Sequence, residues 1–263
     1  LVAWCWKSGG APSGATSATG SAKRINSSGT QDDTSCSALA TAASATITPT
    51  LMSINQKSGF SIVKYEGNST DNATVPTGIS NPEFFILKNI STATSNSVGT
   101  LWVAGLKGVT SSNQVLYLNE SFSLSSNYNG EGHTFNTNTI QFHEASGTEP
   151  FLRSNKSGDT YIMYCWKAVP GYSAFGSYEQ NGSADGPFVY TGFKPAWLII
   201  KCVDQGFRND NSSISAEYTA IDFLSNGFKI RNNYTEVNHS NGGTYAFVCF
   251  SEMPFKYSAT NAR

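Results

Sequence analysis

Short apolar and aromatic runs separated by turn-forming residues are the main pattern of this chain. Downstream of Gly171, the runs Phe188–Thr191 and Trp197–Ile200 follow two reversals, Asn181-Gly182 and Asp185-Gly186-Pro187. Asn, Asp and Gly tolerate the positive φ angles that tight reversals need. No stripe with the period of a helix persists for ten residues. The pattern therefore predicts an all-β fold, an antiparallel β-sandwich or jelly-roll-like arrangement of short strands.

The strand and turn pattern occurs twice along the chain. Four segments of the first half match segments of the second half: Gly59–Ser61 with Gly171–Ser173, Tyr65–Asn68 with Tyr178–Asn181, Phe84–Lys88 with Trp197–Lys201, and Thr160–Lys167 with Thr244–Phe250. Ile140–Phe142 is matched in the same way with Ile221–Leu224. Internal similarity of this kind indicates repeated structure. We therefore predict two related β units, residues 1–168 and 169–263, with one continuous domain over 1–263 as the alternative.

The first half carries two long polar stretches. Residues 8–50 are dominated by Ser, Ala, Gly and Thr, which predicts a long surface loop with one or two weak strands, for example around Thr46-Ile47-Thr48; a flexible linker is the alternative. Ser37–Ala45 is rich in Ala but has no amphipathic stripe, so no helix is expected there. Residues 119–139 are rich in Asn, Ser and Thr and are expected to form an exposed loop.

The opening segment Leu1–Lys7 repeats the closing strand of each unit a third time. Cys5 thereby matches Cys165 and Cys249, and we expect all three to be small buried apolar residues. The segment is interpreted as the tail of a preceding unit in a longer polypeptide, or as the first strand of this domain. The sequence leaves open whether Cys36 forms a disulfide with another cysteine.

Composition excludes several function classes. Only 13% of the 263 residues are charged, about half the usual share, and the net charge is −1. No basic run supports nucleic-acid binding, and no apolar run approaches the roughly 18 residues that a membrane span needs. Low charge with a polar surface of Ser, Thr, Asn and Gly is typical of oligomeric shells, fibres and extracellular adhesins.

Residues of the types found in catalytic and metal-binding sites are few, and their spacing matches no known motif of such sites. The histidines His133, His143 and His239 have no metal-binding spacing and are expected in loops or at the surface. Asp32-Asp33 lacks the further oxygen ligands of a cation site and is interpreted as solvated charge. No nucleophile or nucleotide-binding motif is present. We therefore predict no catalytic residues, no metal and no cofactor, although carboxylate pairs of glycosidases cannot be found from spacing.

Aromatic residues raise a hypothesis of ligand binding. Tryptophan, tyrosine and phenylalanine rings can stack on sugars, but most of those in this chain stand at repeated strand positions, which indicates core packing. Aromatic residues in loops are better contact candidates. We therefore name Tyr128 and Tyr234 as weak ligand-binding candidates.

The second half carries a resemblance to a known family. The segment Asn181–Trp197 resembles the C-terminal domains of tail-fibre and other virion structural proteins of tailed phages, particularly those of marine bacteria and cyanobacteria. Similar residues occur elsewhere in the chain: Ala3–Lys7, Tyr164-Cys165-Trp166, Gly176–Tyr178, Asp222–Lys229, Pro254–Tyr257 and Asn261–Arg263. The first half departs from the family where it has Pro76-Thr77-Gly78 in place of a His-Gly turn. The resemblance implies an all-β C-terminal module, a homotrimer, and no known catalytic residues.

These observations predict a non-enzymatic phage virion structural protein. We expect a distal tail-fibre or spike module that is assembled in the host cytoplasm, joins other virion tail proteins, and contacts a host cell-surface glycan or protein. Residues 8–50 and 119–139 are the expected contact loops. One alternative is a purely structural collar, fibre-shaft or capsid-surface protein. Another is a tailspike that binds or degrades glycans.

Overall fold

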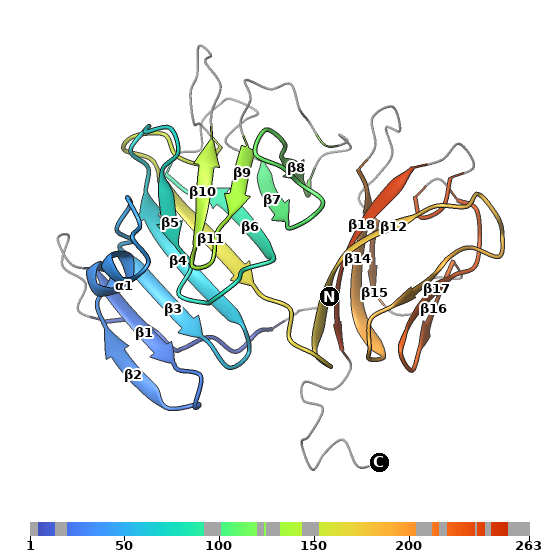
Figure 1. The fold of residues 1–263 in the computed structure, drawn as a ribbon, viewed down its shortest axis with the longest axis horizontal. Coiled ribbons are helices and arrows are strands. Elements are labelled where there is room, and N and C mark those ends of the chain that lie inside the picture. The colour runs from blue at the N-terminus through green and yellow to red at the C-terminus, as the bar shows by residue number, and fades with distance from the viewer. Residues whose placement is uncertain are drawn as a thin grey trace. The chain divides into compact units, whose positions relative to one another are not determined.

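The chain forms two compact β units, Leu1–Val115 with Ser125–Lys167 and Leu116–Leu124 with Ala168–Arg263, which Figure 1 shows as ribbons. This computed structural model describes residues 5–13, 20–91, 101–119, 124, 132–143, 153–203, 212–215, 220–234, 236–239 and 243–251. The predicted all-β class is confirmed, with one short helix in the described residues. No helix in these ranges is long and apolar enough to cross a membrane.

An eight-stranded sheet dominates the first half of the chain. Its order is β2-β1-β3-β4-β11-β6-β7-β8 (Figure 1). Its strands are β1 (Ser21–Ile25), β2 (Gln31–Thr34), β3 (Leu51–Asn55), β4 (Phe60–Glu66), β6 (Phe84–Asn89), β7 (Trp102–Leu106), β8 (Leu116–Tyr117) and β11 (Thr160–Trp166). β1 and β3 pair in parallel. Neighbouring pairs such as β3/β4 and β4/β11 are antiparallel, as the sequence predicted.

A smaller sheet of order β5-β10-β9 packs on the large sheet of the first unit. Its strands are β5 (Thr74–Pro76), β9 (Gly132–Phe135) and β10 (Thr139–His143). Aromatic rings join the two sheets: Phe142 of β10 lies 6.2 Å from Tyr65 and 6.2 Å from Phe85, measured between ring centroids. Burial of these rings supplies much of the hydrophobic stabilisation of the unit.

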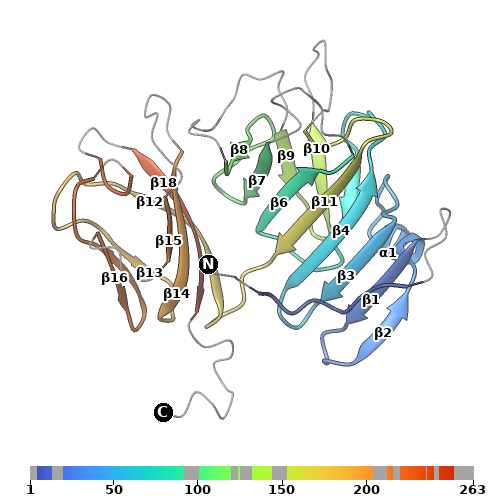
Figure 2. The same ribbon diagram turned by 180° about the vertical axis from the view of Figure 1, so that it is seen from behind.

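The second unit is a sandwich of two sheets, with orders β12-β18-β14-β15 and β13-β17-β16 (Figure 2). Its strands are β12 (Ser173–Glu179), β13 (Phe188–Tyr190), β14 (Pro195–Cys202), β15 (Ser212–Ser215), β16 (Ile221–Leu224), β17 (Gly227–Ile230) and β18 (Thr244–Ser251). Val189, Leu198, Phe228 and Tyr245 belong to the core between the two sheets. The hairpin predicted at Asn226-Gly227 is present between β16 and β17, with Ser225 and Asn226 in the turn and Gly227 as the first residue of β17.

The two units share one topology, which confirms the predicted relation between them. The order β4-β11-β6-β7 corresponds to β12-β18-β14-β15, and β5-β10-β9 corresponds to β13-β17-β16, each in the same order along the chain. The registers agree as well: Tyr65 stands opposite Tyr161, and Tyr178 stands opposite Tyr245. One match is wrong. Ile140–Phe142 corresponds to β17 rather than to Ile221–Leu224, because β10 and β17 are the central strands of the small sheets.

The prediction for residues 8–50 allowed one or two strands but is wrong about their position and about the absence of a helix. Two strands, β1 and β2, and the helix α1 (Cys36–Ala42) lie in this stretch. Ser35 caps the helix, since its hydroxyl accepts a hydrogen bond from the Ala38 N–H at 3.0 Å. The helix buries Cys36 and Ala40, one turn apart, and seven residues are too few to show a stripe. Thr46-Ile47-Thr48 forms no strand.

Three further expectations need correction. Cys5 is exposed, and the segment that contains it is not a strand from Cys5 onward; residues 1–4 lie outside the described ranges. Cys165 and Cys249 are buried as predicted. The five cysteines carry free thiols, and that of Cys36 donates to the carbonyl of Ser21 at 3.3 Å.

Within the expected loop 119–139, Gly132–Phe135 forms β9, because it pairs with β10.

Candidate functional site: an aromatic face on the second unit

The strand β13 presents two aromatic side chains to solvent. Successive side chains of a strand point to opposite faces. Val189 therefore points into the core and is 8% exposed, whereas Phe188 and Tyr190 point outward and are 45% and 70% exposed. Side chains of this size usually lie in the core of a small unit. An exposed pair on one face therefore marks a candidate contact surface.

The neighbouring strand β17 supports the two rings. Phe188 stands opposite Lys229, and Tyr190 stands opposite Gly227. A Cβ atom on Gly227 would lie 3.0 Å from the Phe188 ring and 2.1 Å from the carbonyl oxygen of Val189. Glycine at this position therefore lets the Phe188 ring lie close to the backbone of β17. We call Phe188, Tyr190 and the Gly227 backbone the aromatic face.

The equivalent surface of the first unit is covered by its own chain. Register places Thr74 of β5 where the second unit has Phe188, and Pro76 where it has Tyr190. The carbonyl of Thr74 accepts a hydrogen bond from the Ile47 N–H at 3.0 Å, and α1 contacts β5. β13 is an edge strand of its sheet. Among the described residues, no segment pairs with the outer edge of β13, whereas the first unit covers the equivalent edge of β5, and unpaired edges are available for pairing.

Charged side chains beside the aromatic face are held in ion pairs. Lys229 Nζ lies 2.8 Å from an oxygen of Asp185, and Arg231 Nε lies 2.5 Å from an oxygen of Asp222. The hydrogen bond from Lys229 lowers the pKa of the Asp185 carboxyl. Opposite charges are thus matched beside the rings, which favours a neutral partner for the aromatic face over a highly charged one.

A buried asparagine fixes the turn that leads into β13. Asn238 accepts hydrogen bonds from the N–H groups of Asn181 and Gly182 at 2.8 and 3.2 Å, and donates to the carbonyl of Ser183 at 2.7 Å. The predicted reversal at Asn181-Gly182 is present, with Gly182 at φ 64°. This loop is therefore rigidly attached to the core that carries the aromatic face.

Of the two tyrosines that we named from the sequence as ligand-binding candidates, the structure describes only Tyr234. Tyr234 is 51% exposed and lies in a turn, where its carbonyl accepts hydrogen bonds from the N–H groups of Val237 and Asn238. Tyr128 lies outside the described residues. Sequence reasoning missed Phe188 and Tyr190 because it assigned strand aromatics to the core. The alternation of Phe188, Val189 and Tyr190 was the available signal.

The histidines differ from the expectation of loop or surface positions. His133 is buried on β9, and its Nε2 lies 2.7 Å from the Thr110 hydroxyl; burial lowers its pKa to about 3. His143 is half-buried on β10, with its ring nitrogens bonded to Thr134 and Asn72. His239 is half-buried and lies outside helices and strands. The described part of the chain holds no group of three or more His, Cys, Asp or Glu side chains arranged for a metal ion.

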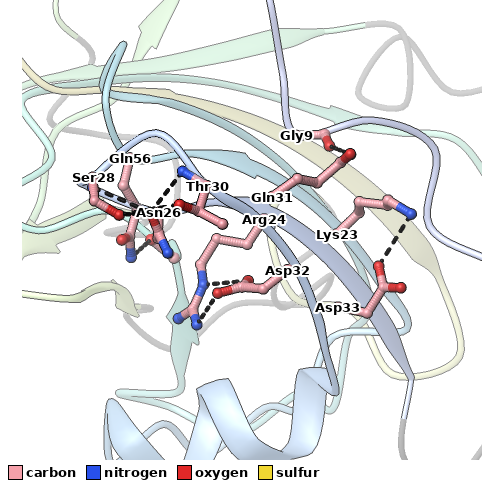
Figure 3. Close-up of polar contacts among 11 residues, drawn as sticks. Gly9, Lys23, Arg24, Asn26, Ser28, Thr30, Gln31, Asp32, Asp33 and Gln56 are labelled. Atoms are coloured by element: carbon pink, nitrogen blue, oxygen red, sulfur yellow. Dashed lines mark hydrogen bonds and ion pairs between the residues drawn. The ribbon is translucent and has the colours of Figure 1, made fainter.

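The acidic pair at the β1–β2 hairpin is bound to basic residues rather than simply solvated. Arg24 donates two hydrogen bonds to the Asp32 carboxylate, from Nε and from Nη2, both at 2.9 Å (Figure 3). Lys23 Nζ lies 3.2 Å from a carboxylate oxygen of Asp33. The hydrogen bond from Arg24 lowers the pKa of Asp32. Cross-strand register explains the pairing, because Arg24 stands opposite Asp32 and Lys23 opposite Asp33.

Comparison with known proteins identifies the family but no activity. The chain belongs to the family described as domain of unknown function (DUF7483), whose model matches residues 32–210 and 206–254. No curated protein matches the chain, and no solved structure matches it.

Proposed function

We propose that this protein is a non-enzymatic virion structural module of a tailed phage, which contacts the host cell surface through the aromatic face of its second unit. The exposure of Phe188 and Tyr190 on one edge strand is the observation that carries the contact role. The assignment to a phage virion is supported by the resemblance over Asn181–Trp197, and the host-contact role by the low charge of the chain.

A glycan is the partner that suits this surface. The C–H groups on one side of a pyranose ring pack on the flat faces of Phe188 and Tyr190, and the paired charges of Asp185 and Lys229 offer hydrogen bonds to sugar hydroxyls. Aromatic residues often dominate binding energy at interfaces. A single shallow face binds weakly, and three copies in a homotrimer would raise the avidity by 10²–10⁴-fold.

The experiment is binding of the fluorescently labelled chain to a glycan array and to a panel of marine bacterial and cyanobacterial cells. We expect the double variant Phe188→Ala/Tyr190→Ala to lose at least about tenfold in apparent affinity, which corresponds to about 1.4 kcal/mol. Ile90→Ala is the control, because it removes another exposed large apolar side chain that lies outside the aromatic face. Equal binding by the double variant would overturn the role of the aromatic face.

A purely structural role is the second candidate, and the edge of β13, which no described segment covers, favours it. The first unit covers the equivalent strand β5 with its own residues, so a neighbouring subunit would cover β13 in a similar way. Light scattering separates the two roles. If the aromatic face joins subunits, the double variant will have a lower molar mass than the wild type. If it binds glycans, the molar mass will not change.

A further inference from the structure

The backbone of β13 presents hydrogen-bonding groups to the outer edge of its sheet. In an antiparallel pair, the N–H and C=O of every second residue point at the neighbouring strand. The Pro187 carbonyl accepts a hydrogen bond from β17, and the Thr191 N–H donates to the turn between β16 and β17, both at 3.0 Å. The backbone groups of Phe188 and Tyr190 therefore point away from β17, and they have no hydrogen-bond partner in the described part of the chain.

The first unit satisfies or removes the same backbone groups. The equivalent residues of β5 are Thr74 and Pro76. The Thr74 carbonyl accepts a hydrogen bond from the Ile47 N–H at 3.0 Å, and the Thr74 N–H donates to the Thr46 hydroxyl at 2.8 Å. Pro76 has no N–H that could be left unpaired. Two units of one topology thus differ at this edge, because only the first covers it with described residues of its own chain.

Charged side chains do not protect β13 either. Edge strands often carry charges that prevent association with another sheet. β16, the other edge strand of the same small sheet, carries Asp222, and β2, an edge strand of the first unit, carries two aspartates. β13 consists of Phe188-Val189-Tyr190, and the nearby charges of Asp185 and Lys229 are paired with each other. A second copy of β13 can therefore approach this edge without electrostatic repulsion.

An antiparallel pair of two β13 strands satisfies all of these backbone groups. With Val189 of both copies at the two-fold axis, Phe188 of each copy stands opposite Tyr190 of the other, and four backbone hydrogen bonds form. The opposed Phe188 and Tyr190 rings become cross-strand aromatic pairs, which stabilise antiparallel strands. We infer that β13 pairs with β13 of a second copy of this chain and joins two three-stranded sheets into one sheet of six strands.

This inference rests on the structural role given above as the second candidate function, and a proline variant tests it. Tyr190→Pro removes the outward N–H, and Pro76 at the equivalent position of β5 shows that the fold accepts proline there. Tyr190→Ala is the matched control, since it removes the same ring but keeps the N–H. Light scattering over a range of concentrations measures self-association. We expect Tyr190→Pro to self-associate at least about tenfold more weakly than Tyr190→Ala.

Hydrogen exchange of the wild type tests the pairing without any substitution. The Val189 amide points at β17 and should be protected at every concentration. The amides of Phe188 and Tyr190 should become protected only as the protein concentration rises. Pairing doubles the molar mass over the same range, whether the paired particles are single chains or trimers.

The possible outcomes separate this inference from the proposed function. A constant molar mass up to about 1 mM chain overturns the pairing, as do fully exchanging Phe188 and Tyr190 amides at that concentration. Equal self-association of Tyr190→Pro and Tyr190→Ala also overturns it; if Phe188→Ala/Tyr190→Ala then still lowers the molar mass, the aromatic face joins subunits through side chains alone. Binding to the glycan array is scored independently, so its absence leaves the pairing of β13 standing.

Discussion

Asn155 and Asn238 occupy the same position in the two units and perform the same task. Each side chain is fully buried and accepts a hydrogen bond from the N–H of an asparagine three residues after a core tyrosine: Asn68 for Asn155 at 3.0 Å, and Asn181 for Asn238 at 2.8 Å. Each also donates to a carbonyl of the same turn, that of Thr70 or that of Ser183. A buried asparagine therefore ties a distant turn to the core in both halves.

A stacked tyrosine pair completes this arrangement in each unit. The rings of Tyr65 and Tyr161 lie 5.3 Å apart, and those of Tyr178 and Tyr245 lie 5.5 Å apart. In each unit, the hydroxyl of the first tyrosine donates to the carbonyl just before the buried asparagine: Tyr65 to Ser154 at 2.5 Å, and Tyr178 to Val237 at 2.7 Å. The arrangement thus links three segments of the chain.

Replacing the buried asparagine will destabilise its unit. Asn238→Ala removes several hydrogen bonds and leaves the N–H of Asn181 without its acceptor. We expect a loss of about 2–4 kcal/mol in the free energy of unfolding. Urea unfolding followed by tryptophan fluorescence measures it, with the exposed Asn233→Ala as the control. Equal midpoints for the two variants would contradict the structural role of Asn238.

The hydroxyl of Tyr178 is expected to contribute a smaller amount. Tyr178→Phe keeps the stacked ring but leaves the Val237 carbonyl without its donor, which costs about 1–2 kcal/mol. Tyr190→Phe removes the hydroxyl of an exposed ring and should cost nothing measurable. A Tyr178→Phe variant as stable as Tyr190→Phe would show that this hydrogen bond makes no net contribution.

His133 will make stability depend on pH. The Thr110 hydroxyl donates to the Leu106 carbonyl, so Nε2 of His133 is the donor to Thr110 and its Nδ1 carries a lone pair. Protonation would place a buried charge on the ring, and burial lowers its pKa to about 3. The unfolded chain, with an ordinary pKa near 6.5, binds this proton first. Stability therefore falls as the pH drops from about 6.5 to 3.

The variant His133→Ile isolates this contribution, because Ile221 is the equivalent residue of the second unit by register. We expect the wild type to lose up to about 1.4 kcal/mol per pH unit more than the variant over this window. Urea unfolding of both proteins at several pH values measures the difference. Parallel curves for the two proteins would show that His133 is accessible to protons in the folded state.

Thiol labelling will distinguish Cys5 from the other cysteines. Cys5 is exposed, whereas Cys36, Cys165, Cys202 and Cys249 are buried. Burial raises the pKa of Cys36 to about 11 and that of Cys249 to about 12. Both side chains therefore stay protonated at neutral pH, and a protonated thiol is unreactive. We expect one thiol to react with an aromatic disulfide reagent in native protein and five in urea. Cys5→Ser should abolish the native reaction; persistent reaction would indicate local opening around a buried cysteine.

The repeat was predictable because it is carried by local patterns. A Thr-Gly dipeptide occurs in both units, as Thr77-Gly78 and as Thr191-Gly192, and forms the same turn in each. Both glycines have positive φ, 73° and 80°, and each threonine hydroxyl donates to the carbonyl two residues on at 2.8 Å. The residue types at these positions are dictated by the backbone of the turn. Short-range chemistry of this kind is visible in the sequence.

Features that depend on distant segments were missed. Asn155 and Asn68 are 87 positions apart, and nothing local to either asparagine indicates the contact. α1 buries only Cys36 and Ala40, so its stability depends on packing that the sequence does not display. Phe188 and Tyr190 were not named as contact candidates, because aromatic residues in strands were interpreted as core residues and the face that a strand exposes depends on how its sheet packs.

The central position of β18 has a consequence for synthesis of the protein. β18 lies between β12 and β14 in its sheet, yet it is the final strand of the second unit along the chain. During translation β12 and β14 therefore leave the ribosome without their shared neighbour, and β11 of the first unit imposes the same delay on β4 and β6. Each nascent unit thus carries two strands that each have an unpaired edge until the strand between them emerges, the stage at which chaperones have most to protect.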